Sequence, residues 1–215
     1  MIIDDYRDYK EKIKQSPYYQ VQKYIEDTLP EYSSSHTDSV SNSQYESKKW
    51  LCDILSTGKF GKKDPLKIEI VGSWFGWPFI EMLEQSVIKI DQLDLYDLDE
   101  HCHNITRKYF GYFNPSYKVN IHYDYFERND YRIRHMIICT SCEHMDDIVE
   151  MKEYYKETPK PVLVLQSNNY YEIEDHINCV DNAEELAFKN EIVNIQVASE
   201  KDFGYYKRFL VIGTW

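Results

Sequence analysis

From residue 66 onward the chain alternates short apolar segments with segments rich in helix-forming residues, and this alternation constrains the fold most. The predicted strands are residues 66–71, 91–98, 118–123, 135–139 and 161–166, followed by a terminal hairpin of 192–198 and 208–213. The predicted helices are residues 79–86, 100–110, 146–155 and 182–189. Such alternation produces a mostly parallel sheet, because right-handed crossovers place helices on both of its faces. We therefore predict a doubly wound α/β domain over residues 66–215, with a seven-stranded sheet that ends in an antiparallel hairpin.

Residues 1–65 have a different pattern and are predicted to form a helical cap. Ile13, Val21 and Ile25 mark one helical stripe, which Pro17 interrupts, so two short helices are expected rather than one. Residues 32–44 are dense in serine and are expected to form a loop, either a linker or a lid over a ligand. A further helix with Trp50, Leu51, Ile54 and Leu55 on one face precedes the sheet domain.

Charge and cysteine content limit the possible functions. The formal charge of −12 repels phosphate backbones, so a nucleic-acid substrate is disfavoured. The chain contains no apolar run of the ~18 residues that a membrane-spanning helix requires, and its start lacks the pattern of a signal peptide. A cytoplasmic location is the expectation, and in that reducing compartment the five cysteines are expected to be free thiols.

The end of the first predicted strand carries a glycine-containing turn, Ile68-Glu-Ile-Val-Gly-Ser-Trp-Phe-Gly76. The order of elements after it resembles the class I S-adenosylmethionine (SAM)-dependent methyltransferases, in which a glycine-rich turn here lets the backbone approach SAM. Gly72 and Gly76 match the outer glycines of that pattern, and Trp74 stands at the middle one. The resemblance implies that Gly72, Ser73 and Gly76 bind SAM as the cofactor.

Acidic residues follow the second and third predicted strands. By the same resemblance, Asp97 accepts the ribose hydroxyls of SAM, with Asp99 as the second candidate, and Asp124 with Tyr125 contacts the adenine. One carboxylate offers two oxygens to two hydroxyls, which suits a ribose. Asp99 has an alternative role as the N-cap of the helix that begins at Glu100.

The segment after the fourth strand, Cys139-Thr-Ser-Cys-Glu-His-Met145, contains two adjacent titratable groups. In the methyltransferase family this segment lies between the SAM methyl group and the acceptor, which makes Glu143 and His144 the candidate catalytic residues. Either could take a proton from an attacking nitrogen or oxygen, and their alternative role is structural, at the start of a helix. Gln166, Asn168 and Asn169, at the end of the fifth strand, are candidates for binding the acceptor.

No metal site is predicted. Cys139 and Cys142 form a lone CxxC pair, whereas a structural zinc site needs about four ligands and no second pair exists. The expected partner is a small-molecule acceptor, and the oligomeric state cannot be read from the sequence. Segments such as Leu163-Val-Leu-Gln-Ser-Asn-Asn169 also resemble small methyltransferase-like proteins of tailed phages.

Together these features predict a transferase that moves the methyl group of SAM to a small polar molecule or a free chain end. An enzyme that transfers the aminocarboxypropyl arm of SAM, or cleaves SAM, is an alternative, since Trp74 in place of a glycine suits a changed SAM pose. A non-catalytic binding protein with the same fold is the third possibility.

Overall fold

The computed structural model describes residues 6–14, 16–57, 64–123, 135–155 and 159–215. Its contacts divide the chain into two compact units. The sheet unit comprises Leu66–Ser73, Asp91–Leu98 and Val119–Trp215, and the helical unit comprises Met1–Pro65, Trp74–Ile90 and Asp99–Lys118.

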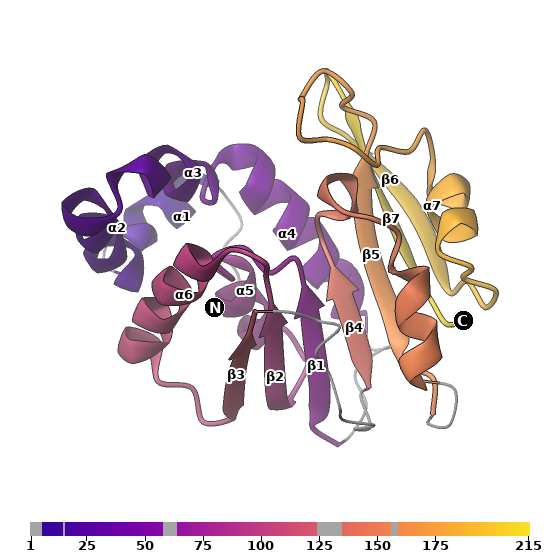
Figure 1. Cartoon of the computed structure of the whole chain (residues 1–215), viewed down its shortest axis with the longest axis horizontal. Coiled ribbons are helices and arrows are strands. Elements are labelled where there is room, and N and C mark those ends of the chain that lie inside the picture. The colour runs from indigo at the N-terminus through magenta and orange to yellow at the C-terminus, as the bar shows by residue number, and fades with distance from the viewer. Residues whose placement is uncertain (1–5, 15, 58–63, 124–134, 156–158) are drawn as a thin grey trace. The chain divides into compact units, whose positions relative to one another are not determined.

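In the described part of the chain, the sheet has seven strands in the order β3-β2-β1-β4-β5-β7-β6 (Figure 1). The strands are β1 (Leu66–Val71), β2 (Ile90–Tyr96), β3 (Lys118–His122), β4 (Met136–Cys139), β5 (Val162–Asn168), β6 (Val197–Asp202) and β7 (Lys207–Gly213). β4 pairs in parallel with both β1 and β5, whereas β7 pairs antiparallel with β5 and with β6. The predicted mostly parallel sheet with a terminal antiparallel hairpin is confirmed.

One face of the sheet is covered by two helical segments of the sheet unit, the 3-10 helix η3 (Ile148–Tyr155) and α7 (Ala183–Lys189). Alternate residues of a strand share a face, and Ile137 and Cys139 of β4 lie with Leu163 and Leu165 of β5 in one buried cluster. The cluster also contains the inward side chains of η3 and of α7. Asn182, predicted as the start of α7, is its N-cap and accepts a hydrogen bond from the Glu185 amide at 2.8 Å.

The helical unit contains the following segments: α1 (Tyr6–Ile13), α2 (Pro17–Thr28), η1 (Pro30–Tyr32), α3 (Ser33–Asp38), α4 (Asn42–Leu55), α5 (Phe79–Gln85) and α6 (Glu100–Phe113). The expected break at Pro17 is confirmed, since Pro17 begins α2 and Ser16 caps it. A core cluster of this unit joins Val21 and Ile25 of α2 to Ile105 and Tyr109 of α6. No described helix is long and apolar enough to cross a membrane.

Two of the predicted local structures are wrong. The serine-dense segment 32–44 is mostly helical, because its hydroxyls bond to nearby backbone: Ser41 caps α4 through the Gln44 amide, and Ser39 donates to the His36 carbonyl oxygen at 2.7 Å. His36 and Val40 of this segment are also buried, and this packing holds it as helix. The strand predicted at 192–198 is displaced to β6, since the Val193 and Asn194 amides both bond to the Thr214 carbonyl oxygen.

Candidate functional site

The strand order reverses between β1 and β4, and ligands of open α/β sheets bind at the carboxyl ends of the strands beside such a reversal. The turn after β1 has left-handed backbone at every second residue, with φ of 62° at Gly72, 50° at Trp74 and 70° at Gly76. Trp74 therefore keeps the backbone form of the glycine that it replaces, although an L side chain rarely adopts it. The turn thus has left-handed backbone at Trp74 as well as at the two glycines.

Gly72 also permits a close approach between the ends of β1 and β4. The Ser141 hydroxyl after β4 donates to the Gly72 carbonyl oxygen at 3.2 Å. A Cβ atom at position 72 would lie 3.0 Å from Ser141 Oγ and 3.5 Å from Met145 Sδ, so the Ser141 side chain would have to move by a few tenths of an ångström to admit it. The Ser73 amide is bonded to the Tyr96 carbonyl oxygen at the end of β2, which joins the three strand ends.

The acids after β2 differ in their surroundings. Asp97 is half-buried directly after β2, and its amide bonds to the His122 carbonyl oxygen of β3. Asp99 belongs to the helical unit, where it caps α6 by accepting from the His101 amide and from the Tyr32 hydroxyl, both at 2.8 Å. Partial burial alone would raise the pKa of Asp99, but these hydrogen bonds lower it below its ordinary value. The capping role expected as an alternative is thus confirmed.

Two predicted site residues, Asp124 and Tyr125, lie outside the described residues. Within the described part, the end of β3 is bound to the middle of β2 through Asp94, which is fully buried. Asp94 accepts from the Asn120 side chain at 2.8 Å and lies 3.0 Å from His122 Nε2. The Tyr96 and His122 rings stack at 4.5 Å, which further ties the ends of β2 and β3 together.

A buried polar cluster occupies the carboxyl ends of β4 and β5. Glu143 lies in the 3-10 helix η2 (Cys142–His144) and is 1% exposed. Its Oε1 accepts from Arg208 Nη2 at 2.9 Å and from Asn168 Nδ2 at 2.6 Å. Arg208 Nη1 also donates to the Thr140 carbonyl oxygen at 3.0 Å. Glu143 Oε2 is buried with no hydrogen-bond partner in the described residues.

The three candidate acceptor-binding residues are all held by bonds within the sheet unit. Asn168 donates to Glu143, and its Oδ1 accepts from the Tyr170 amide at 2.8 Å. Asn169 Oδ1 accepts from the Lys207 amide at 2.7 Å, and Gln166 is fully buried within β5. Asn168 therefore positions Glu143, and direct contact of these residues with an acceptor stays a prediction.

His144 lies beside a second histidine that comes from the loop after β5. The rings of His144 and His176 are 4.6 Å apart in an edge-to-face arrangement. Loss of hydration around its ring lowers the pKa of His144, although part of the side chain stays exposed to solvent and the negative charge of Glu143 opposes the effect. His144 is therefore mostly neutral at pH 7, with one ring nitrogen available as an acceptor.

Sequence reasoning missed Arg208 and His176. Arg208 had a detectable signal, since it is a cation at the start of the otherwise apolar run of β7. His176 had none, because it is 32 positions from His144 and only the fold of the 169–181 loop brings the two together.

The cysteine prediction is confirmed: all five are free and buried. Cys142 contributes no reactive thiolate, because a hydrogen bond with Cys139 and burial raise its pKa.

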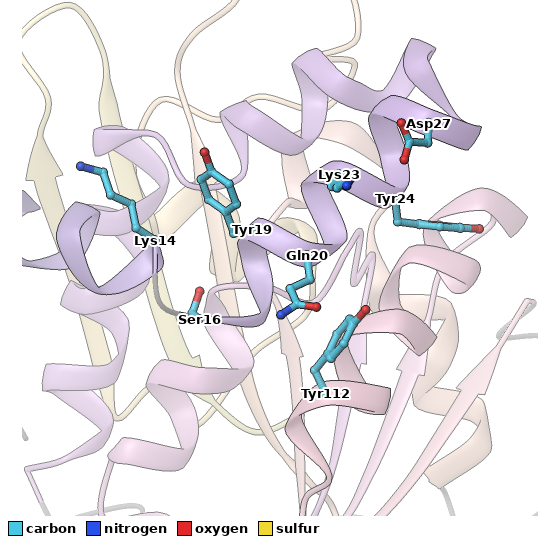
Figure 2. Close-up of a pocket in the computed structure, with 8 residues that line it drawn as sticks. All are labelled: Lys14, Ser16, Tyr19, Gln20, Lys23, Tyr24, Asp27 and Tyr112. Carbon is cyan, nitrogen blue, oxygen red and sulfur yellow. The ribbon is translucent and has the colours of Figure 1, made fainter.

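The helical unit carries a surface pocket of about 570 Å³ (Figure 2). Figure 2 shows side chains from α2 and the residues before it, with Tyr112 from α6 on the other side. The lining residues are Lys14, Ser16, Tyr19, Gln20, Lys23, Tyr24, Asp27 and Tyr112. None of them is a predicted site residue, and Ser16 is already used as the N-cap of α2.

Comparison with known proteins identifies the class of fold. The chain matches no protein-family model and no curated protein sequence. It is similar in structure to the cyclopropane synthase MmaA2 from Mycobacterium tuberculosis, with a TM-score of 0.58 and 10% identity over 80% of this chain and 84% of that one.

A second similar structure is magnesium protoporphyrin IX methyltransferase (ChlM) from Synechocystis PCC 6803 with bound SAM, with a TM-score of 0.55 and 12% identity over 93% of this chain and 97% of that one. A third is Streptococcus pneumoniae Sp1610, a putative tRNA (m1A22) methyltransferase, with a TM-score of 0.52 and 13% identity over 75% and 68% of the two chains. The protein thus has the Rossmann-like fold of the class I SAM-dependent methyltransferases. The resemblance to phage proteins stays a prediction.

Proposed function

We propose that this protein is a SAM-dependent methyltransferase that acts on a small polar acceptor or a free chain end. The observation that carries the proposal is the left-handed turn at Gly72, Trp74 and Gly76, directly after the strand where the sheet order reverses. In this fold class that turn is where the backbone approaches SAM. Its retention with a tryptophan in the middle supports a ligand-binding role for the turn.

The residues present fit SAM. Gly72 and Ser73 would face the methionine part of the ligand, and the half-buried Asp97 would accept the ribose hydroxyls. Glu69, the nearest acid before the glycine, is not available for this purpose, because it is fully buried and accepts from the Tyr155 hydroxyl at 2.6 Å. When bound, SAM supplies an electrophilic methyl group.

Glu143 and His144 act on the acceptor side in this proposal. Arg208 and Asn168 both donate to Oε1 of Glu143 and hold that carboxylate in place. His144 is the proposed proton acceptor, because its lowered pKa leaves one ring nitrogen unprotonated near pH 7. The methyl transfer breaks the carbon–sulfur bond, and the acceptor heteroatom bonds to the methyl carbon while its proton passes to a base.

SAM titration by calorimetry tests the proposal. Asp97→Ala leaves the two ribose hydroxyls without an acceptor, so the SAM affinity should fall by ~1–3 kcal/mol. Asp91→Ala is the matched control, since Asp91 is exposed at the opposite end of the same strand and should leave SAM affinity unchanged. Equal affinities in the wild type and Asp97→Ala would remove Asp97 from the site.

Product analysis separates methyl transfer from the alternatives. Formation of S-adenosylhomocysteine indicates methyl transfer, whereas methylthioadenosine indicates transfer of the aminocarboxypropyl arm. SAM binding without either product would identify a non-catalytic binding protein and contradict the proposed activity.

A further inference from the structure

We infer that Glu143, His144 and His176 of the sheet unit form a binding site for one divalent transition-metal ion. One ligand-capable atom of each residue lies within 4.8 Å of the other two. Ligands held ~2.1 Å from one ion in tetrahedral coordination are about 3.4 Å apart, so closing the site requires the ligand atoms to approach one another by up to about 1.4 Å. Two imidazole nitrogens and one carboxylate oxygen suit Zn²⁺ and neighbouring first-row ions such as Mn²⁺ and Fe²⁺.

The second observation is the unpartnered oxygen of Glu143. The side chain is 1% exposed, its Oε1 is bonded twice, and its Oε2 is buried without a hydrogen-bond partner in the described residues. A buried polar atom without a partner typically costs ~1–3 kcal/mol. Since this oxygen belongs to the residue beside both histidines, a cation among the three provides its missing partner.

Both histidines are oriented as metal ligands usually are. A ligating imidazole typically donates its other N–H to a backbone carbonyl or a carboxylate, which fixes the tautomer and the ring direction. His176 Nδ1 lies 2.7 Å from the Tyr170 carbonyl oxygen, which leaves Nε2 for a ligand. His144 likewise bonds to the backbone of Asp175, which leaves its second nitrogen.

The loop that carries His176 is tied to η2, so the three residues are held in place before any ion binds. The Asn178 amide bonds to the Glu143 carbonyl oxygen at 3.0 Å, and Asn178 Nδ2 bonds to the Met145 carbonyl oxygen at 2.9 Å. The positive charge of Arg208 opposes a cation, but the same loop carries the exposed acids Glu172, Glu174 and Asp175. These acids and the net charge of −12 make the local potential more favourable for a cation.

Three protein ligands leave at least one coordination position open. The use of that position in catalysis rests on the proposed methyl transfer: it would bind a hydroxyl oxygen of the acceptor and promote loss of the hydroxyl proton to water. In that case the free nitrogen of His144 coordinates the ion and does not accept a proton. The acceptor hydroxyl ionises on the metal, and this step takes the place of proton abstraction by His144. An oxygen nucleophile is accordingly the acceptor class that this site favours.

Calorimetric titration of the full chain with Zn²⁺, after removal of metals by a chelator, tests the site without any substrate. We expect one ion per chain, and we expect His176→Gln and His144→Gln each to weaken binding at least about tenfold. His101→Gln is the matched control, since His101 is exposed on α6 of the helical unit and should leave Zn²⁺ affinity unchanged. Co²⁺ should give a visible spectrum without thiolate charge-transfer bands, and His176→Gln should change that spectrum.

Absence of saturable one-to-one binding, or unchanged affinity in both histidine variants, would overturn the metal site. Thiolate bands with Co²⁺ would assign the ion to cysteines and also overturn it. SAM titration in the presence of the chelator tests the proposed function separately. SAM binding without Zn²⁺ binding removes only the metal site, whereas Zn²⁺ binding without SAM binding removes only the proposed function.

Discussion

The two units of the protein each contain a histidine in a polar cluster, and the two clusters differ in how completely their hydrogen bonds are made. In the helical unit, His36 is fully buried, with Nδ1 2.5 Å from Gln22 Oε1 and Nε2 2.6 Å from the Tyr109 hydroxyl. It also stacks on Tyr18 at 4.6 Å. Both ring nitrogens are used, so this cluster binds the helices of the unit to one another and has no group left for a ligand.

In the sheet unit, His144 is exposed and His176 is half-buried, and each has one ring nitrogen that no described bond uses. The buried Glu143 beside them has an unpartnered oxygen. A complete network of hydrogen bonds stabilises a fold, whereas an incomplete one held rigidly by Arg208 and Asn168 is typical of a binding or catalytic site. The comparison therefore separates a structural histidine from the two histidines to which we propose a function.

The largest expected effect is on turnover. Glu143→Gln with His144→Asn roughly keeps volume and hydrogen bonding, so SAM affinity should survive while the rate falls ~10²–10⁴-fold. His36→Asn should lower stability and leave the rate of the folded protein unchanged. The measurement is SAM turnover with a methyl acceptor, with His144→Asn alone as a second variant if the double variant does not fold. Wild-type rates in the double variant and in His144→Asn would show that Glu143 and His144 have only structural roles.

The next effect is on stability, through the buried ion pair of the sheet unit. Arg208→Leu leaves the Glu143 carboxylate buried without its partner charge, which should lower the free energy of unfolding by ~3–5 kcal/mol. Adding Glu143→Leu to that variant removes the unpaired charge and should restore most of the loss. Urea denaturation of the two variants measures both values. If the double variant is no more stable than Arg208→Leu, the charge is not the cause.

Acidification should destabilise the helical unit through His36. Burial lowers the pKa of His36 from 6.5 to about 4, so the unfolded chain binds the proton first as the pH falls. Stability is complete above pH 6.5, falls by about 3 kcal/mol between pH 6.5 and 4, and levels off below pH 4. Urea denaturation at several pH values should show that His36→Asn removes this slope. His144→Asn should change it less, because His144 is exposed to solvent; equal changes in both variants would contradict the comparison.

The smallest effect concerns Asp99, which the sequence left with two roles. Asp99→Ala removes the N-cap of α6 and the acceptor of the Tyr32 hydroxyl, which should lower stability by about 1 kcal/mol. Tyr32→Phe removes only the second bond and separates the two contributions. SAM affinity, measured by calorimetry, should stay at the wild-type value in Asp99→Ala. A tenfold weaker affinity would return Asp99 to the ribose site.

The sequence by itself determined the order of the elements and, to within two residues, the ends of every strand except β6. Hydrophobic periodicity and turn-forming residues are local properties of the sequence. For this reason β1 was predicted at its observed bounds, and Asn182 was predicted at the start of α7. The turn at Gly72 could be predicted for the same reason. Gly72 and Gly76 lie two residues before and two residues after Trp74, and glycines at such positions favour left-handed backbone. The serine-dense segment was mispredicted because its helix depends on the burial of His36, which no local pattern indicates.

Only the tertiary structure decided which side chains meet at the candidate site. Glu143 and His144 stood out as neighbours in the chain, but Asn168, His176 and Arg208 join them from the end of β5, the loop after it and the start of β7. Strand pairing sets these contacts, as in the register that places Asn168 opposite Arg208. Such pairing joins residues far apart in the chain, so it follows from the packing of the whole sheet and leaves no trace in the spacing of any one motif.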